Sequence, residues 1–170
     1  ILIPRPYYFA YPKLVLLSGM KPVFTDLVNG YIDINDFKRK LKQCDGAIIN
    51  NPCNPSGTVQ NDGTMREIER IAHASNKWII SDEVYKDINY TKENYKLNGN
   101  KIIRIDSFSK TFDMTGYRVG YLYSHNKELI EAIVEIKDST ALNTSILSQQ
   151  MAHAALKSPR SYVKEHLKIW

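Results

Sequence analysis

Short apolar segments alternate along this chain with segments whose apolar residues recur at helical spacing, and this alternation constrains the fold more than any other feature. The strand-like segments are Ile1–Ile3, Pro22–Thr25, Ala47–Asn50, Trp78–Ser81, Ile102–Asp106 and Arg118–Tyr123. The helix-like segments are Phe9–Ser18, Ile34–Gln43, Thr64–Ser75 and Lys127–Asp138. Strands that are separated by helices favour right-handed crossovers. The sequence therefore predicts an α/β fold, a mostly parallel sheet flanked by helices on both faces.

Two segments refine this prediction. In Thr64–Ser75 the apolar residues Met65, Ile68 and Ile71 recur at helical spacing, and charged residues fill the other face. We expect Asp62 to cap this helix. The segment Arg118–Tyr123 follows Lys110 too closely for a helical crossover, so we expect this strand to run antiparallel to its neighbour.

Composition narrows the class of protein. The 170 residues suffice for one domain, and 43% hydrophobic with 24% charged residues exclude an intrinsically disordered chain. No apolar run approaches the length of a membrane span. The net charge of +5 comes from scattered Lys and Arg, which indicates a basic surface rather than a nucleic-acid-binding face. Cys44 and Cys53 lack the spacing of a metal site or a disulfide framework and favour a reducing cytoplasm.

Both ends of the chain have the character of internal segments. Ile1–Ile3 is strand-like and has no initiator Met, charged lead-in or cleavage site. Val163, Leu167 and Trp170 belong to an unfinished helical pattern. We therefore interpret the chain as a fragment of a longer protein.

Polar residues follow three successive predicted strands. They lie in the segments Asn50–Pro52, Ser81–Glu83 and Ser107–Lys110. In open parallel sheets, ligands bind outside the carboxyl ends of the strands. The sequence therefore predicts a binding site where these three segments meet.

Lys110 is the candidate nucleophile of this site. Just past a strand end and among hydroxyl residues, it can be partly desolvated, which favours the neutral amine that forms a Schiff base with a carbonyl. On its own, Lys110 fits a solvent-facing loop lysine better. Arg118, Ser107 and Ser109 favour the catalytic interpretation, because guanidinium and hydroxyl groups suit a phosphate. We expect Gly116 to allow the chain to turn back tightly toward Lys110.

Three further side chains suit an aromatic ligand with a charged ring nitrogen. Asp82 ends a buried strand, where an unpaired carboxylate is costly and a protonated ring nitrogen would satisfy it. Tyr85 can donate from its phenol to a ring oxygen, and a rigid turn aims Asn54. Asp82 and Glu83 also suit a helix N-cap, and Asn54 a plain turn. Tyr8 can stack on a flat ring or belong to the core.

Four ordered motifs resemble the class I/II aminotransferases, which are fold-type I pyridoxal-phosphate enzymes. They are Asn51–Gly57, Ser81–Tyr85, Ser107–Lys110 and Gly116–Tyr121, and Ile3–Tyr11 is similar to the aromatic segment of that family. The likeness runs through nearly the whole chain. Ser56 stands where the family often has Thr, which keeps the hydroxyl group.

The resemblance implies a role for each candidate residue. Lys110 would hold pyridoxal 5'-phosphate as a Schiff base and later move the substrate proton. Asp82 would pair with the pyridine nitrogen and sustain the ring as an electron sink. Tyr85 and Asn54 would bond the phenolic oxygen of the ring, and Tyr8 would stack on the ring face. The phosphate would be held by Ser107, Ser109 and Arg118.

The resemblance also implies an activity and an architecture. The reaction moves an amino group from an amino acid to a 2-oxo acid, in a cytoplasmic enzyme that usually forms homodimers. Residues 1–158 would be part of the large cofactor-binding domain, and residues 159–170 would begin the connection to a C-terminal small domain. A phosphate loop upstream of Ile1 and an Arg that grips the substrate carboxylate would lie outside this chain, so the fragment alone would be an incomplete enzyme.

Other functions share much of this pattern. A carbon–sulfur lyase or an amino-acid decarboxylase of the same fold would carry nearly the same cofactor residues. A transcription regulator with an aminotransferase-like sensor domain would also keep the lysine, although nothing in these residues reads DNA. A binding domain without chemistry is disfavoured, because core packing does not require five such polar groups in this order. The sequence leaves the amino donor and acceptor open.

Overall fold

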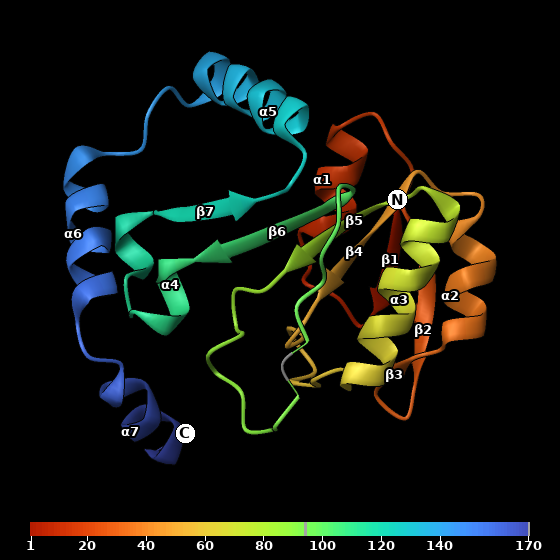
Figure 1. Ribbon diagram of the computed structural model, residues 1–170, viewed down its shortest axis with the longest axis horizontal. Coiled ribbons are helices and arrows are strands. Elements are labelled where there is room, and N and C mark those ends of the chain that lie inside the picture. Colours follow the sequence, from red (N-terminus) through yellow and green to blue (C-terminus); the bar gives the residue numbers. More distant parts are fainter. Residues whose placement is uncertain (94, 170) are drawn as a thin grey trace.

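The computed structural model describes residues 1–93 and 95–169. Across these residues the strands form one sheet in the order β3-β2-β1-β4-β5-β6-β7 (Figure 1). The strands are β1 (Leu2–Arg5), β2 (Val23–Val28), β3 (Tyr31–Ile32), β4 (Gly46–Asn50), β5 (Trp78–Asp82), β6 (Ile102–Ser107) and β7 (Gly120–Tyr123). The helices are α1 (Tyr11–Leu17), α2 (Ile34–Leu41), α3 (Asp62–Ser75), α4 (Phe108–Thr111), α5 (Lys127–Thr140), α6 (Ile146–Lys157) and α7 (Ser161–Ile169).

The sheet is parallel in its centre and antiparallel at both edges. Strands β2, β1, β4, β5 and β6 run parallel, whereas β3 pairs antiparallel with β2 and β7 antiparallel with β6. The predicted fold class is confirmed, including the antiparallel strand after Lys110. We predicted that this strand begins at Arg118, but it begins at Gly120. Arg118 instead ends a short 3-10 helix, Thr115–Tyr117, in the left-handed conformation (φ 52°), which breaks the extended backbone.

Helices cover both faces of the parallel strands, as predicted. Neighbouring residues of a strand point to opposite faces, so each strand contributes to two cores. Leu2, Ile49 and Ile79 belong to the core beneath α2 and α3. Ile3 and Ile48 belong to the core beneath α1. This two-sided burial explains why the strands are nearly continuous in apolar character.

The predicted cap of α3 is wrong by one residue. Asn61 is the N-cap, and its side chain accepts a hydrogen bond from the backbone N–H of Thr64 at 2.8 Å. Asn61 keeps an extended backbone (ψ 154°), whereas Asp62 already lies in the first turn of the helix. Asn and Asp cap helices about equally well, so the sequence did not separate the two neighbours.

The C-terminal helices α5, α6 and α7 form an arc beside β7 and α4 (Figure 1). Val163 and Leu167 lie in α7, as their spacing suggested, and Trp170 lies outside the described residues. Helix α7 contacts α4 through the hydroxyl of Tyr162, which donates to the carbonyl of Thr111 at 3.0 Å. In the part of the chain that is described, no helix is long and apolar enough to cross a membrane.

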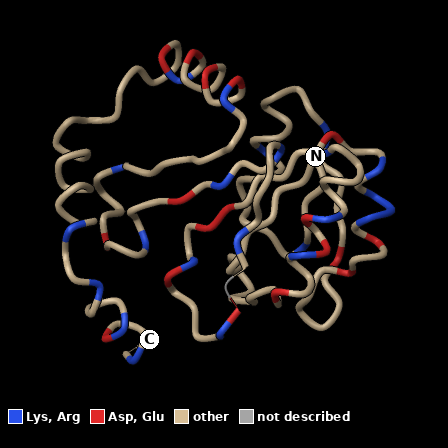
Figure 2. Tube along the Cα trace, viewed as in Figure 1, with Lys and Arg blue, Asp and Glu red and all other residues tan. Residues whose placement is uncertain are grey.

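Basic and acidic residues are interspersed over the fold (Figure 2). Several form pairs one helical turn apart, such as Glu67 with Arg70 in α3 and Lys127 with Glu131 in α5. Such exposed pairs each contribute little to stability. Basic residues therefore lie among acidic ones along the chain (Figure 2).

Candidate active site

Strands β4, β5 and β6 bring their polar ends to one edge of the sheet. Asn50 is paired in register with Asp82, and Asp82 with Ile105, two positions before Ser107. A cleft of about 420 Å³ opens at this edge. The residues that the sequence analysis selected all line it: Tyr8, Asn54, Asp82, Tyr85, Ser107, Ser109, Lys110 and Arg118. The other lining residues are Tyr11, Asn50, Val84, Ile105, Asp106 and Thr115.

Lys110 lies in the short helical turn α4 that follows β6. The side chain of Ser107 caps this turn by accepting from the backbone N–H of Ser109 at 3.1 Å. Lys110 is half-buried, and its Nζ lies 5.6 Å from the centroid of the Tyr85 ring. The amine therefore lies beside an aromatic wall of the cleft, and Lys110 is not a fully exposed loop lysine.

Asn54 and Tyr85 point their polar groups at each other. Asn54 Nδ2 donates to the hydroxyl of Tyr85 at 3.3 Å. The backbone N–H of Asn54 donates to Oδ1 of Asn50 at 2.7 Å, which fixes the turn after β4. The turn therefore does more than reverse the chain. It places the amide of Asn54 beside the phenol of Tyr85 in the cleft.

Asp82 is held by two hydrogen bonds at the end of β5. Its Oδ2 accepts from the hydroxyl of Tyr11 at 2.5 Å, and its Oδ1 accepts from the backbone N–H of Val84 at 3.2 Å. Burial raises the pKa of Asp82, and the hydrogen bonds from Tyr11 and Val84 oppose this rise. A turn follows Asp82 instead of a helix, so the N-cap interpretation of Asp82 and Glu83 is wrong.

Hydroxyl groups and a guanidinium also line the cleft. Arg118 is exposed, and its Nη1 donates to the carbonyl of Thr115 at 2.8 Å. The hydroxyl of Thr115 donates to the carbonyl of Ser109 at 2.9 Å. The remaining N–H groups of Arg118 and the hydroxyl of Ser109, which line the same cleft, are donors suited to an anion.

The chain turns back tightly at Gly116 as expected, within the 3-10 helix Thr115–Tyr117, but this turn does not require a glycine. A Cβ on Gly116 would meet no atom within 4 Å, and Gly116 is not among the residues with positive φ. The close approach is at Gly120, where a Cβ would lie 2.7 Å from the carbonyl oxygen of Asp106. Pairing between β6 and β7 therefore depends on Gly120, and the chain turns through Arg118.

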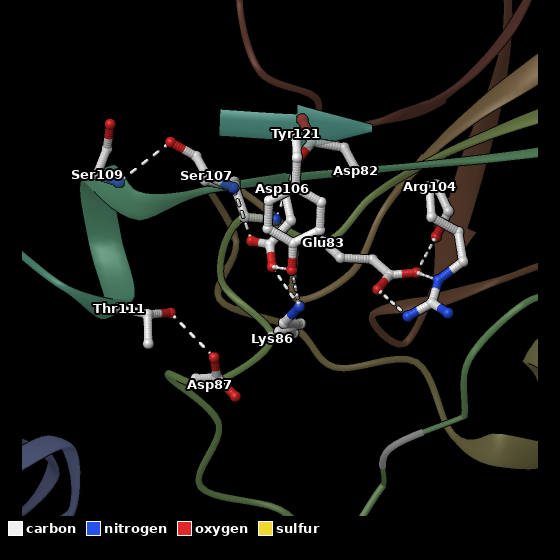
Figure 3. A network of polar contacts seen from close by, with 12 residues as sticks. Asp82, Glu83, Lys86, Asp87, Arg104, Asp106, Ser107, Ser109, Thr111 and Tyr121 are labelled. Carbon is white, nitrogen blue, oxygen red and sulfur yellow. Dashed lines mark hydrogen bonds and ion pairs between the residues drawn. The ribbon is translucent and has the colours of Figure 1, made fainter. Parts of the chain in front are cut away.

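A polar network connects the segment after β5 with β6 and β7 (Figure 3). Lys86 forms an ion pair with Asp106 and donates to the hydroxyl of Tyr121 at 3.0 Å. That hydroxyl donates to Oδ2 of Asp106 at 2.7 Å. Asp106 also accepts, through Oδ1, from the backbone N–H of Ser107 at 2.7 Å. The network thus fixes the segment that carries Tyr85 relative to the strand end that carries Ser107.

Next to this network, Glu83 and Arg104 form a two-pronged ion pair. Both guanidinium–carboxylate distances are 2.7 Å, and the hydroxyl of Ser81 donates to the same carboxylate at 3.0 Å. Glu83 is buried and fully engaged by these contacts. Glu83 therefore has a structural role. Of these two neighbours, only Asp82 lines the cleft.

The sequence pattern of aminotransferase class I and II matches residues 1–169. The chain belongs to this family. Class I and II aminotransferases generally depend on pyridoxal phosphate. A half-buried amine, a half-buried carboxylate and a cluster of anion donors around one cleft fit a phosphorylated aldehyde on a nitrogen-containing ring.

This chain is similar to (5-formylfuran-3-yl)methyl phosphate transaminase of Methanocaldococcus jannaschii, with 36% identity over 93% of this chain and 41% of the relative. It is 30% identical to an aspartate aminotransferase of Bacillus sp. (strain YM-2), over 100% of this chain and 46% of the relative. Its fold matches the crystal structure of an aromatic aminotransferase from Pyrococcus horikoshii OT3, with a TM-score of 0.91 and 32% identity over 98% of this chain and 48% of the other. The chain therefore spans less than half of these relatives.

Sequence reasoning missed two residues of this candidate site. Tyr11 was seen only as part of an aromatic segment, and Asn50 only as a strand end. Pro12 gives a signal for Tyr11, because Pro favours the first turn of a helix and so places the start of α1 at Tyr11. The hydrogen bond of Asn50 to the backbone of Asn54 had no signal beyond the motif itself.

Proposed function

We propose that the full-length protein is a pyridoxal-phosphate-dependent aminotransferase that moves an amino group from an amino acid to a 2-oxo acid. The gathering of Lys110, Asp82 and Arg118 around one cleft carries this proposal. The names of the similar proteins, which are aspartate and aromatic aminotransferases among others, support an amino acid and a 2-oxo acid as the substrates.

Each residue has a task that its chemistry allows. The amine of Lys110 would hold the cofactor by its aldehyde and would also hold and return the proton of the substrate α-carbon. Asp82 would pair with the ring nitrogen and favour its protonated form. Pyridoxal phosphate supplies the electron sink that makes the α-proton acidic. The phosphate would be held by Ser107, Ser109 and Arg118.

Tyr85, Asn54 and Tyr8 orient the ring. The phenol of Tyr85 and the amide of Asn54 would both donate to the phenolic oxygen, since they already converge in the cleft. Tyr8 would cover one face of the ring; its own ring lies edge-on to that of Tyr11 at 5.5 Å. Fixing the ring on several sides lowers the entropic cost of reaching the reactive geometry.

We also propose the wider setting of this domain. Residues 1–158 form part of the large cofactor-binding domain, and residues 159–170 begin the connection to a smaller C-terminal domain. The full-length enzyme would form a homodimer in the cytoplasm. The free thiols of Cys44 and Cys53 support a reducing compartment.

The decisive experiment uses the full-length protein and its Lys110→Ala variant. After addition of pyridoxal phosphate and borohydride reduction, mass spectrometry should find the cofactor on the peptide that contains Lys110. Lys110→Ala should lose this adduct and lower kcat by at least about a thousandfold, because a covalent anchor and proton carrier is removed. Lys127→Ala, in the exposed first turn of α5, is the matched control and should keep both.

A reduced adduct that survives Lys110→Ala would contradict the proposal, since another lysine would then be the anchor. Product analysis with a panel of amino donors separates the related reactions. Release of a 2-oxo acid with amination of the acceptor supports transamination. Ammonia with a free thiol would assign a carbon–sulfur lyase, and carbon dioxide a decarboxylase.

A further inference from the structure

Tyr11 is the closest side-chain partner of Asp82, and the proposed function gives it no task. Its hydroxyl lies 2.5 Å from Oδ2 of Asp82. Tyr11 is the first residue of α1 and is only 8% exposed, packed with Ile3, Val15 and Ile48. The packing of α1 on the sheet therefore holds this hydroxyl against the carboxylate.

The direction of this hydrogen bond follows from the two groups. Burial, together with the negative charge of Asp82, raises the pKa of Tyr11, so the phenol keeps its proton and donates it. The carboxylate accepts. The other carboxylate oxygen of Asp82, Oδ1, already accepts a hydrogen bond from the backbone N–H of Val84 at 3.2 Å. Asp106 and Glu83 act in the opposite sense, because their negative charges favour protonation of Asp82.

We propose that Tyr11 is a positioning residue that keeps Asp82 ionised and thereby keeps the shared proton on the ring nitrogen of the bound cofactor. The inference rests on the proposed function, because it requires a ring with a basic nitrogen against Asp82. One proton lies between the carboxylate and the ring nitrogen. A hydrogen bond to the carboxylate lowers its affinity for that proton. Without the hydroxyl the proton moves toward Asp82, and the ring becomes a weaker electron sink.

The test compares the full-length holoprotein with Tyr11→Phe, each loaded with pyridoxal phosphate that carries ¹⁵N in the ring. In the wild-type protein the ¹⁵N resonance should have the shift of a protonated pyridine. In Tyr11→Phe it should move toward the shift of an unprotonated pyridine, and kcat should fall roughly tenfold with little change in KM, as expected for the loss of one hydrogen bond to a charged group. Tyr7→Phe is the matched control, because Tyr7 stacks on Phe24 in the same segment. It should keep the wild-type resonance.

Three outcomes are distinct. An unchanged ¹⁵N resonance in Tyr11→Phe, with the cofactor still attached at Lys110, overturns the role of Tyr11 and leaves the proposed function standing. A wild-type protein that never attaches the cofactor at Lys110 overturns both. If Tyr11→Phe does not fold, 3-fluorotyrosine at position 11 replaces it as the variant. As a stronger donor it should hold the resonance at or beyond the protonated position, and a shift in the other direction overturns the inference.

Discussion

Arg118 combines a special backbone conformation with an exposed charged group at the rim of the cleft. Its φ of 52° is uncommon for a residue with a side chain, and it directs the chain from the 3-10 helix into β7. The guanidinium is engaged by a single hydrogen bond to the carbonyl of Thr115 among the contacts described. Most of its donors therefore remain for an anion, which is the state expected of a phosphate ligand before binding.

Replacing Arg118 should weaken the grip on the cofactor without disturbing the fold. For Arg118→Ala we expect the dissociation constant of pyridoxal phosphate to rise roughly ten- to a hundredfold, because a hydrogen bond to a charged group contributes about 1.5–3 kcal/mol. Equilibrium dialysis of the full-length protein measures this change. Arg70→Ala, on the exposed side of α3, should leave the affinity as it is. Equal affinities for wild type and Arg118→Ala would exclude Arg118 as a phosphate ligand.

Residue chemistry could be predicted from the sequence where a motif carried it. The polar groups at the strand ends were selected correctly as neighbours, because parallel strands bring their carboxyl ends together. Tyr11 was not selected as a site residue, because its contact with Asp82 depends on how α1 packs across the sheet. The position that requires a glycine, Gly120 instead of Gly116, was missed for a related reason. Proximity of the backbone at Gly120 comes from strand pairing, and no local pattern in the sequence reports it.

At the scale of the elements, helix α2 packs on the sheet through an apolar face and is also hydrogen-bonded to it through Asp36. Phe37 and Leu41 bury the inner side of α2, and Asp33 caps its start. Asp36 reaches the sheet by accepting from the buried hydroxyl of Thr25 at 2.6 Å and forms an ion pair with Lys40 at 2.7 Å. The hydrogen bonds from Lys40 and Thr25 lower the pKa of Asp36 to about 2.

This lowered pKa predicts an acid-dependent contribution to stability. Folded Asp36 binds a proton less readily than unfolded Asp36, whose ordinary pKa is 3.8, so its contribution is complete above that value and is lost as the pH falls toward about 2. Asp36→Asn should therefore lower the free energy of unfolding at neutral pH, and the difference from wild type should shrink with acidification. Urea unfolding at a series of pH values measures it. A difference that stays constant down to about pH 2 would contradict the assignment to Asp36 ionisation.

Helices were predictable where their apolar residues recur at helical spacing. Helices α2, α3 and α5 were expected within two residues at each end, although α5 has no buried residue. Helix α6 was not, because Ile146 and Leu147 are exposed and only Ser148 and Ala152 are buried, which leaves no apolar stripe in the sequence. Strand β3 has two residues, which are too few for an alternating apolar pattern to be recognised in the sequence.

At the scale of the molecule, the cleft is assembled from segments that are distant in sequence. Tyr8 and Tyr11 come from the connection between β1 and β2, Asn54 from the loop after β4, and Lys110 from the turn after β6. The sheet holds these segments in mutual position, together with the network of Lys86, Asp106 and Tyr121 that spans the last strands (Figure 3).

That network should couple stability to cofactor binding. Asp106→Asn removes the charge opposite the half-buried Lys86, which should lower the free energy of unfolding by roughly 1–3 kcal/mol. It also weakens the acceptor that holds the backbone of Ser107 at 2.7 Å, so the cofactor should dissociate faster. Urea unfolding and stopped-flow release of pyridoxal phosphate measure the two effects, with Asp138→Asn on exposed α5 as the control. Because the contacts with Lys86 and with Ser107 share one carboxylate, a loss of stability with unchanged cofactor release would show that the network supports the sheet alone and does not hold the strand ends for the ligand.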